Sequence, residues 1–236
     1  MGTAISITII LLWFLNLFYA LNYVKADFTN IFTYLFVLLQ TYLYTGLFIV
    51  AHDAMHRTVS KNKTINDWIG RICSFLYAAM SYKKLLKNHL DHHKYPGEEK
   101  DPDFNVKTQN FFIWFATFFI RYSTIAQFLI MGLLFNILKN FYPISSVIAY
   151  WMGPAFLSSM QLFYFGTYKP HMKPHTEEMK PHNARSLKLN HLWAMLSCYF
   201  FGYHWEHHEN PRVPWWKLWK EKENRLLKNF SQINIP

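Results

Sequence analysis

The chain has 236 residues, which is the size of one domain, so we expect a single domain over residues 1–236. Hydrophobic residues make up 52% of it and charged residues 16%, whereas soluble domains average about 45–50% and about 25%, so the composition favours a membrane protein. Two cysteines are too few for an iron–sulfur cluster or a disulfide framework, and basic loops at a membrane explain the net charge of +10 better than nucleic-acid binding does.

Four apolar segments are long enough to cross a bilayer, whose hydrocarbon core of about 30 Å takes roughly 20 helical residues. In chain order they are residues 4–24, 31–51, 111–135 and 145–168. The third contains Arg121, and Gly153-Pro154 in the fourth favours a kink. The apolar segment 68–82 is shorter and contains Arg71, which is typical of a half-buried or interfacial helix.

Basic residues are concentrated on one side of this arrangement. Residues 52–110 hold ten Lys and Arg and residues 169–236 hold eleven, so 21 of the 24 fall in two segments that share a face. Cytoplasmic loops carry such an excess. We therefore predict an all-α, multi-pass integral membrane protein with four transmembrane helices, both termini in the cytoplasm and a cytoplasmic, histidine-rich cap that holds a dimetal site.

The histidines form three boxes in the same two polar segments. One box has the pattern HxxxH at the cytoplasmic end of the second span, and two have the pattern HxxHH. Residues three or four apart share one face of a helix, so each box can offer two or three imidazoles to a common site. The eight box histidines are His52, His56, His89, His92, His93, His204, His207 and His208.

Eight imidazoles exceed the roughly four ligands of a tetrahedral zinc and suit two metal ions with open positions. Imidazole binds zinc, copper, iron and nickel, and oxygen chemistry on an unactivated lipid favours iron. A ninth ligand is expected after the fourth span, where His171 is the first choice and His175 and His182 are alternatives. His191 precedes an apolar run, and we interpret it as an ordinary surface histidine.

Carboxylates near the boxes are candidate partners for the ligands, since a metal-bound histidine usually donates its other N–H to a carboxylate or a carbonyl. An adjacent residue points away from its neighbour on a helix, so Asp53 would serve a histidine other than His52. The alternative for each is an ordinary charged residue facing water. The candidates are Asp53, Asp91, Asp103 and Glu206, together with Asp101.

Longer sequence motifs around the histidine boxes give a more specific pattern. The first box reads HDAMH from His52 to His56, and the second reads NHLDHH from Asn88 to His93. At these words the chain resembles the β-carotene 4-ketolases of the CrtW type, within the membrane fatty-acid desaturase and hydroxylase superfamily. Arg57 stands where that family is expected to have a glycine, and Lys169 where it has an apolar residue. The resemblance covers about residues 45–220 and includes Pro96-Gly97, Asp101-Pro102-Asp103-Phe104, Gly166-Thr167-Tyr168, Pro170-His171, His182-Asn183-Ala184-Arg185-Ser186, the third box from Phe201 to His208, Pro211 and Val213-Pro214-Trp215-Trp216.

The resemblance implies an oxygenase with a di-iron centre that oxidises the 4-position of a β-ionone ring twice. A geminal diol forms and loses water, so that β-carotene becomes echinenone and then canthaxanthin. The carotenoid would enter from the bilayer, the metals would bind and reduce O2, and an external reductant such as reduced ferredoxin would supply electrons. The sequence does not decide whether one ring or both react, or whether hydroxylated rings are accepted.

Two other readings stay open. One is a carotenoid hydroxylase or a fatty-acyl desaturase of the same superfamily. The other is a protein of a different class, a membrane zinc hydrolase or a metal-binding receptor, which would need fewer ligands and no electron donor. Metal content separates the second reading from an iron oxygenase.

Overall fold

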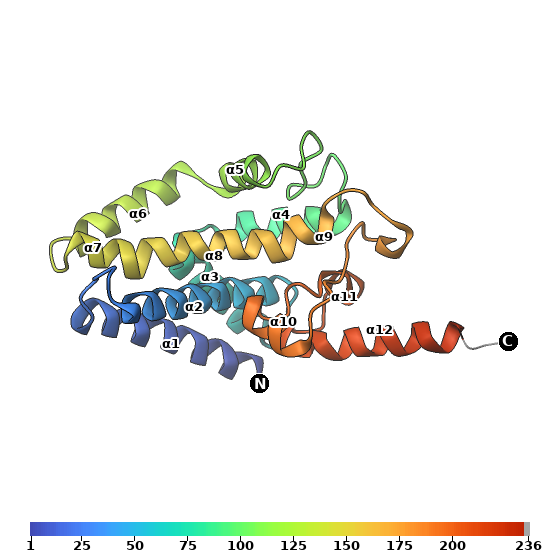
Figure 1. The fold of residues 1–236 in the computed structure, drawn as a ribbon, viewed down its shortest axis with the longest axis horizontal. Coiled ribbons are helices and arrows are strands. Elements are labelled where there is room, and N and C mark those ends of the chain that lie inside the picture. Colours follow the sequence, from blue (N-terminus) through green and yellow to red (C-terminus); the bar gives the residue numbers. More distant parts are fainter. Residues whose placement is uncertain (234–236) are drawn as a thin grey trace.

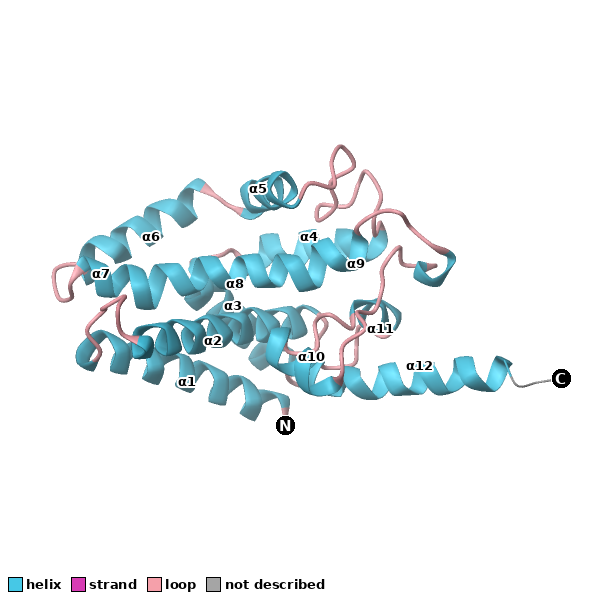
Figure 2. Cartoon of the chain, in the orientation of Figure 1, coloured by secondary structure: helices cyan, strands magenta, loops and turns pink. Residues whose placement is uncertain are grey.

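The computed structural model describes the backbone of residues 1–233 and the side chains of residues 1–228. Within that part of the chain the protein is helical, without a β-strand, and one isolated bridge joins Ser186 to Tyr203. Figure 2 shows helices joined by loops, with the longer loops gathered at one end of the molecule. The expectation of an all-α fold is confirmed.

Two long apolar helices form one side of the molecule (Figure 1). They are α1, Gly2–Tyr23, and α2, Ile31–Met55, and both are long and apolar enough to cross a membrane. The α2 helix begins at Asn30, whose side chain accepts a hydrogen bond from the backbone N–H of Phe32. A buried hydrogen bond of 2.6 Å from Asn16 to Gln40 joins the two helices, so neither amide is left unpaired in the apolar interior.

The segment expected as the third span is broken. It consists of α5, Phe111–Tyr122, and α6, Ile125–Leu138, which are bent by 90° relative to each other. The break falls at Ser123, which has an extended backbone, and Thr124, whose side chain caps α6 by accepting from Gln127 N–H. A cap of this kind starts a new helix and does not continue the old one, because it satisfies N–H groups that a continuous helix would bond internally.

The segment expected as a fourth span is one helical run from Ile144 to His171. It comprises α7 (Ile144–Val147), α8 (Gly153–Phe163) and α9 (Lys169–His171), with π-helical turns at Ile148–Met152 and Tyr164–Tyr168. The first π turn lies just before Gly153-Pro154, where it accommodates the proline without ending the run.

Length and composition therefore support two membrane spans, or three if the bent pair α5 and α6 counts as one. Two π turns divide the helical run 144–171, and none of its α-helical parts alone is long enough to cross a membrane. Apolar helices and the exposed apolar surface agree with membrane association. Within the described chain α6 buries none of its residues, and Phe128, Leu129 and Leu133 are more than half exposed.

Shorter helices close one end of the long ones. The expected half-buried segment 68–82 belongs to α3, Lys63–Ala78, followed by α4, Tyr82–Lys94. After the run 144–171 the chain forms α10 (His191–Cys198), α11 (His204–Glu209) and α12 (Leu218–Ile233), with 3-10 turns at Glu177–Met179 and Trp215–Lys217. The C-terminal end of α2 meets α4, α9 and α11 there, and this end carries the histidines.

Candidate metal centre

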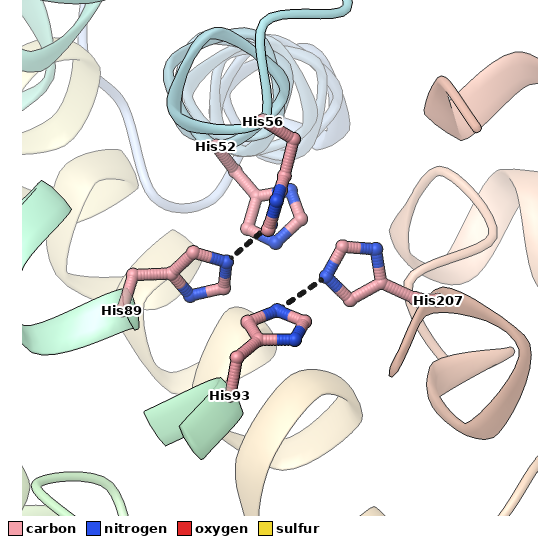
Figure 3. A group of neighbouring side chains, drawn as sticks. All are labelled: His52, His56, His89, His93 and His207. Carbon is pink, nitrogen blue, oxygen red and sulfur yellow. Dashed lines mark hydrogen bonds between the residues drawn. The ribbon is translucent and has the colours of Figure 1, made fainter. Parts of the chain in front are cut away.

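Five histidines from three helices face one another in a first group (Figure 3). The end of α2 contributes His52 within the helix and His56 at its C-cap, and α4 and α11 contribute the others. One ring nitrogen of each lies within 4.8 Å of those of the other four. The members are His52, His56, His89, His93 and His207.

Four more histidines form a second group with the same spacing limit, and all four are buried. His92 comes from α4, His171 from the end of the run 144–171, and the others from α11. The two groups are adjacent, because the ring centroids of His93 and His208 lie 4.3 Å apart. The members are His92, His171, His204 and His208.

Helical spacing decides which group each imidazole joins. In α4, His89 and His93 are four residues apart and face the first group, whereas His92 faces the second. In α11, His204 and His208 are four apart and face the second group, whereas His207 faces the first. The HxxHH pattern thus sends its i and i+4 imidazoles to one site and its i+3 imidazole to the other. The sequence left open how the ligands divide between two metals, and the structure divides each HxxHH box in this way.

His171 is the ninth member, as the sequence favoured. Its Nδ1 lies 2.9 Å from the backbone oxygen of Asn183, so that nitrogen donates and Nε2 is left bare. Nε2 of His171 is buried without a hydrogen-bond partner among the described residues, 1% of the residue being exposed. A buried bare nitrogen that faces three other imidazoles is well suited to a cation. No sequence pattern indicates Asn183 as the partner, because twelve residues separate it from His171.

The alternatives to His171 lie outside both groups. His175 Nε2 lies 2.9 Å from the backbone oxygen of His171, and His182 Nε2 lies 2.9 Å from Glu209 Oε2. His191 is similarly engaged, 3.0 Å from the hydroxyl of Tyr203 and 3.2 Å from Glu223. These contacts engage each of the three histidines outside the two groups.

Asp101 is the carboxylate most directly linked to a histidine. Its two oxygens lie 2.9 and 3.0 Å from His92 Nδ1, and they also accept from the backbone N–H groups of Gly97 and Asp103, both at 2.8 Å. Burial alone would lower the pKa of His92, but Asp101 and Asp103 raise it to about 9. A carboxylate that makes an imidazole more basic in this way also strengthens it as a metal ligand.

Two other predicted carboxylates, Asp103 and Glu206, differ in their partners. Asp103 Oδ2 lies 3.8 Å from His92 Nδ1, its other oxygen accepts from the Tyr122 hydroxyl, and burial raises its pKa to about 6. Glu206 is buried on α11 and pairs with Arg225 at 3.1 Å; no described residue bonds its Oε2. On α11 Glu206 points away from the three histidines, so its ion pair joins α11 to α12 on the side opposite the metal groups.

Three of the carboxylate expectations need correction, because Glu206, Asp53 and Asp91 form no hydrogen bond with a histidine of the two groups. Asp53 accepts from the backbone N–H of Trp215 at 3.1 Å, and the histidine nearest to it is its neighbour His52, 3.7 Å away. Asp91 lies outside the site: its carboxylate is 41% exposed and pairs with Lys87 one turn earlier. On α4 the histidines at 89, 92 and 93 occupy one face, so residue 91 points to the opposite side.

Arg57 stands where the resembled family is expected to have a glycine, and its backbone conformation is one that glycine favours. It follows the first box with a φ of +63°, in the left-handed region where glycine is at ease. The strained backbone is held by backbone hydrogen bonds around Asp53 and by an ion pair of 2.5 Å from Arg57 to Asp67. The position therefore serves the turn that ends α2.

The electrostatics of the two groups fit metal binding. Burial, with repulsion from His92, lowers the pKa of His56 to about 4, and burial also holds the pKa values of His89, His204 and His207 well below the usual range. Neutral imidazole is the form that binds metal. Pairs of ring nitrogens approach to 2.6 Å between His56 and His89 and to 3.0 Å between His93 and His207. Cations placed between such nitrogens would satisfy all of them, so the donor set fits two metal ions.

An apolar cavity of about 270 Å³ ends on both groups of histidines. Its walls come from α2, α3, the bent pair α5 and α6, and the run 144–171. It touches His52 and His89 of the first group and His92 and His204 of the second. Pockets that enclose a whole drug-sized ligand measure about 300–1,000 Å³, so this cavity fits one end of a longer apolar molecule. The walls include Phe48, Met55, Tyr77, Phe118, Phe128, Met131, Phe156 and Phe201.

The fold and the site together define a helical, membrane-associated protein with two adjacent groups of histidines that could each hold a metal ion. The model of the fatty acid desaturase family matches residues 29–145 and 123–230. The chain belongs to the fatty acid desaturase family.

Several curated proteins are similar to it. The zeaxanthin 4-ketolase of Chlamydomonas reinhardtii is 37% identical over 233 residues, 92% of this chain and 52% of that protein. The β-carotene 4-ketolase 3 of Haematococcus lacustris is 38% identical over 192 residues, 78% of this chain and 59% of that protein. The β-carotene ketolase of Paracoccus sp. (strain PC1) is 38% identical over 189 residues, 75% of this chain and 74% of that protein.

The chain therefore spans about half the length of the algal relatives and about three quarters of the bacterial one. These relatives confirm the resemblance to carotenoid ketolases that the words around the boxes indicate. No solved structure matches the chain.

Proposed function

We propose that this chain is a carotenoid 4-ketolase, which oxidises the 4-position of a β-ionone ring with O2 at a pair of irons. The observation that carries the proposal is the apolar cavity, which leads from the membrane-associated helices to both groups of histidines. Ketolases among the relatives support the choice of substrate class. β-Carotene would give echinenone and then canthaxanthin.

The site is proposed to bind one iron in each group of histidines. Irons held there would supply the oxygen chemistry, with O2 as oxidant and two electrons from outside for each of two successive hydroxylations at the same carbon. The second hydroxylation gives a geminal diol, which loses water to form the ketone. Reduced ferredoxin is the proposed donor, since an acidic protein suits the basic face of the molecule.

The protein's own residues position the ring and keep water out. Phe118, Phe128 and Phe156 give the cavity apolar walls that suit a hydrocarbon ring. His52 and His204 form part of the inner wall, so a ring that fills the cavity lies against one imidazole of each group. Asp101 and Asn183 hold His92 and His171 in orientation through their Nδ1 atoms.

We also propose four spans within a single domain: α1, α2, the bent pair α5 and α6, and the run 144–171. The last contains 28 residues, or roughly 42 Å of helix at about 1.5 Å per residue, which exceeds the hydrocarbon thickness of about 30 Å. With four spans both termini and the histidines share the side that carries most Lys and Arg, which is the cytoplasmic side.

Product analysis tests the ketolase. The chain is expressed in a bacterial host that accumulates β-carotene, and pigments are separated and identified by mass and absorbance. Echinenone and canthaxanthin are expected from the wild type and are lost in His92→Ala. The matched control His175→Ala, outside both groups, retains them. Hydroxylated carotenoids instead would point to a hydroxylase, and unchanged β-carotene with an iron-loaded protein would exclude carotenoid oxidation and direct attention to fatty-acyl substrates.

A further inference from the structure

A second cavity, of about 670 Å³, lies beside the cytoplasmic end of the run 144–171. The run forms one wall, the loop that follows it forms another, and α12 contributes Arg225. None of the nine clustered histidines lines it. It is therefore separate from the apolar cavity that ends on the metal centre.

The rim of this second cavity is basic. Five cationic side chains line it and one carboxylate, Glu178, accompanies them. The cations are Lys169, Lys173, Arg185, Lys188 and Arg225. Arg225 is compensated by Glu206, so four cations face a single acid.

Most of this charge is not neutralised by the protein. Among the described residues Lys169, Lys173 and Lys188 form no ion pair: Lys169 Nζ lies 5.9 Å from the ring centroid of Tyr164, and Lys173 Nζ lies 5.6 Å from that of Phe104. Arg185 is held in place by three carbonyls, donating to those of Lys169 at 3.1 Å, Met172 at 2.7 Å and Pro174 at 2.8 Å. A fixed guanidinium surrounded by unpaired lysines is a preformed site for an anion.

The remaining lining residues are mainly apolar, and we call this part of the lining the floor. Tyr164 and Phe165 come from the second π turn of the run, and Met172, Leu187 and Leu189 come from the loop that follows. Tyr164 lies seven residues before the end of the run at His171, which is roughly 10 Å of helix. The floor therefore extends from the basic rim toward the part of the run that we place in the bilayer.

We propose that this cavity binds an anionic phospholipid, with the phosphate between Lys169, Lys188 and Arg185 and the upper acyl chain against Tyr164 and Phe165. Basic pockets beside membrane helices on the cytoplasmic side suit such headgroups. An acidic protein would also be attracted by the charge, but the hollow shape and the apolar floor match a headgroup with its chain. The proposal goes beyond the ketolase function and rests only on the proposed membrane position of the run.

Lipid retention tests the proposal directly. The full-length, iron-loaded protein is purified in a neutral detergent and titrated with phosphatidylglycerol or phosphatidylcholine, and bound lipids are counted by native mass spectrometry. One phosphatidylglycerol should be retained in preference to phosphatidylcholine. A basic residue near an anionic headgroup contributes about 1 kcal/mol, so the double variant Lys169→Gln/Lys188→Gln should bind phosphatidylglycerol roughly 30-fold more weakly.

The matched control removes two charges elsewhere on the same face. Lys61→Gln/Lys63→Gln, two exposed lysines after the first box, should bind within about twofold of the wild type. Equal losses in both double variants would overturn the proposal, because general charge would then explain binding. Retention of both lipids alike would overturn it as well.

Two further outcomes would assign the cavity to another ligand. Full displacement of the lipid by millimolar inorganic phosphate would make it a site for free phosphate. If Lys169→Gln/Lys188→Gln kept its lipid but lost binding to reduced ferredoxin, the cavity would be a protein-docking surface. Because lipid retention is measured without pigment conversion, its result is independent of the ketolase proposal.

Discussion

Asp101→Asn removes the charge that orients His92 while keeping the size of the side chain. The carboxylate accepts from His92 Nδ1 and from the backbone N–H groups of Gly97 and Asp103. An amide replaces one acceptor oxygen with a donor, which then faces one of those N–H groups. A buried donor left without an acceptor costs about 1–3 kcal/mol, so the free energy of unfolding should fall by that amount.

The effect on the metal centre is separate from the effect on folding and should be of similar size. Removal of a partner that orients a ligating histidine typically lowers metal affinity or activity by roughly 10–100-fold, or about 1.4–2.7 kcal/mol. We expect Asp101→Asn to hold the iron of the second group of histidines roughly 10–100-fold more weakly and to lose a similar factor in ketone formation. Iron is measured in the folded, purified protein after dialysis against a chelator, and product by chromatography.

The matched control is Asp91→Asn on the same helix. Its carboxylate is exposed and pairs only with Lys87, and exposed ion pairs contribute little. It should stay within about twofold of the wild type in iron retention and in activity. If both variants, or neither, lost iron, the assignment of Asp101 as the residue that orients His92 would be refuted.

Two further predictions follow from the same geometry. His171→Ala should lower bound iron from two per chain toward one, whereas His175→Ala should leave it unchanged; equal iron in both variants would exclude His171 as a ligand, as elemental analysis can show. Gly166→Ala would place a Cβ 2.0 Å from Cε1 of Phe201, a wall of the substrate cavity, so we expect about 1–3 kcal/mol of destabilisation and slower turnover. Gly132→Ala meets nothing within 4 Å and should change neither stability nor turnover; a wild-type melting temperature for Gly166→Ala would contradict the packing argument.

The sequence predicted the clustering of the histidines well, because box spacing is a local property. An HxxxH or HxxHH pattern on a helix fixes which imidazoles share a face before any tertiary contact is known. Which imidazoles of different helices share a group was not predictable in this way. It depends on where α4 and α11 lie relative to α2, which places His93 beside His207 while His92 meets His208.

The partners of the ligands were predicted less well for the same reason. Asp101 was among the predicted candidates, but its pairing with His92 was not predicted, and Asn183 was not a candidate. Both residues reach their histidines through loops, and no periodicity encodes a loop conformation. Asp91 could have been set aside from the helical pattern alone, since it lies on the face opposite its neighbours. Its proximity in sequence to two histidines was the misleading signal.

Hydropathy alone does not predict where a span is broken. Residues 111–135 are apolar enough for one span, although Arg121, Ser123 and Thr124 stand near their middle. A Thr that caps a new helix is a small signal within a long apolar segment, yet it turns the chain by 90°. The bend matters for function, because α5 and α6 then supply Phe118 and Phe128 to the same cavity.

The most direct test of the central claim is the iron content and coupling of the purified protein. The chain is expressed with labelled iron, and metal per chain is measured by elemental analysis together with Mössbauer spectroscopy. Two irons per chain, magnetically coupled because the two groups of histidines adjoin, are the result that we predict. One zinc per chain, or a single isolated iron, would contradict a dimetal oxygenase. One zinc would favour the alternative of a membrane zinc hydrolase or a metal-binding receptor.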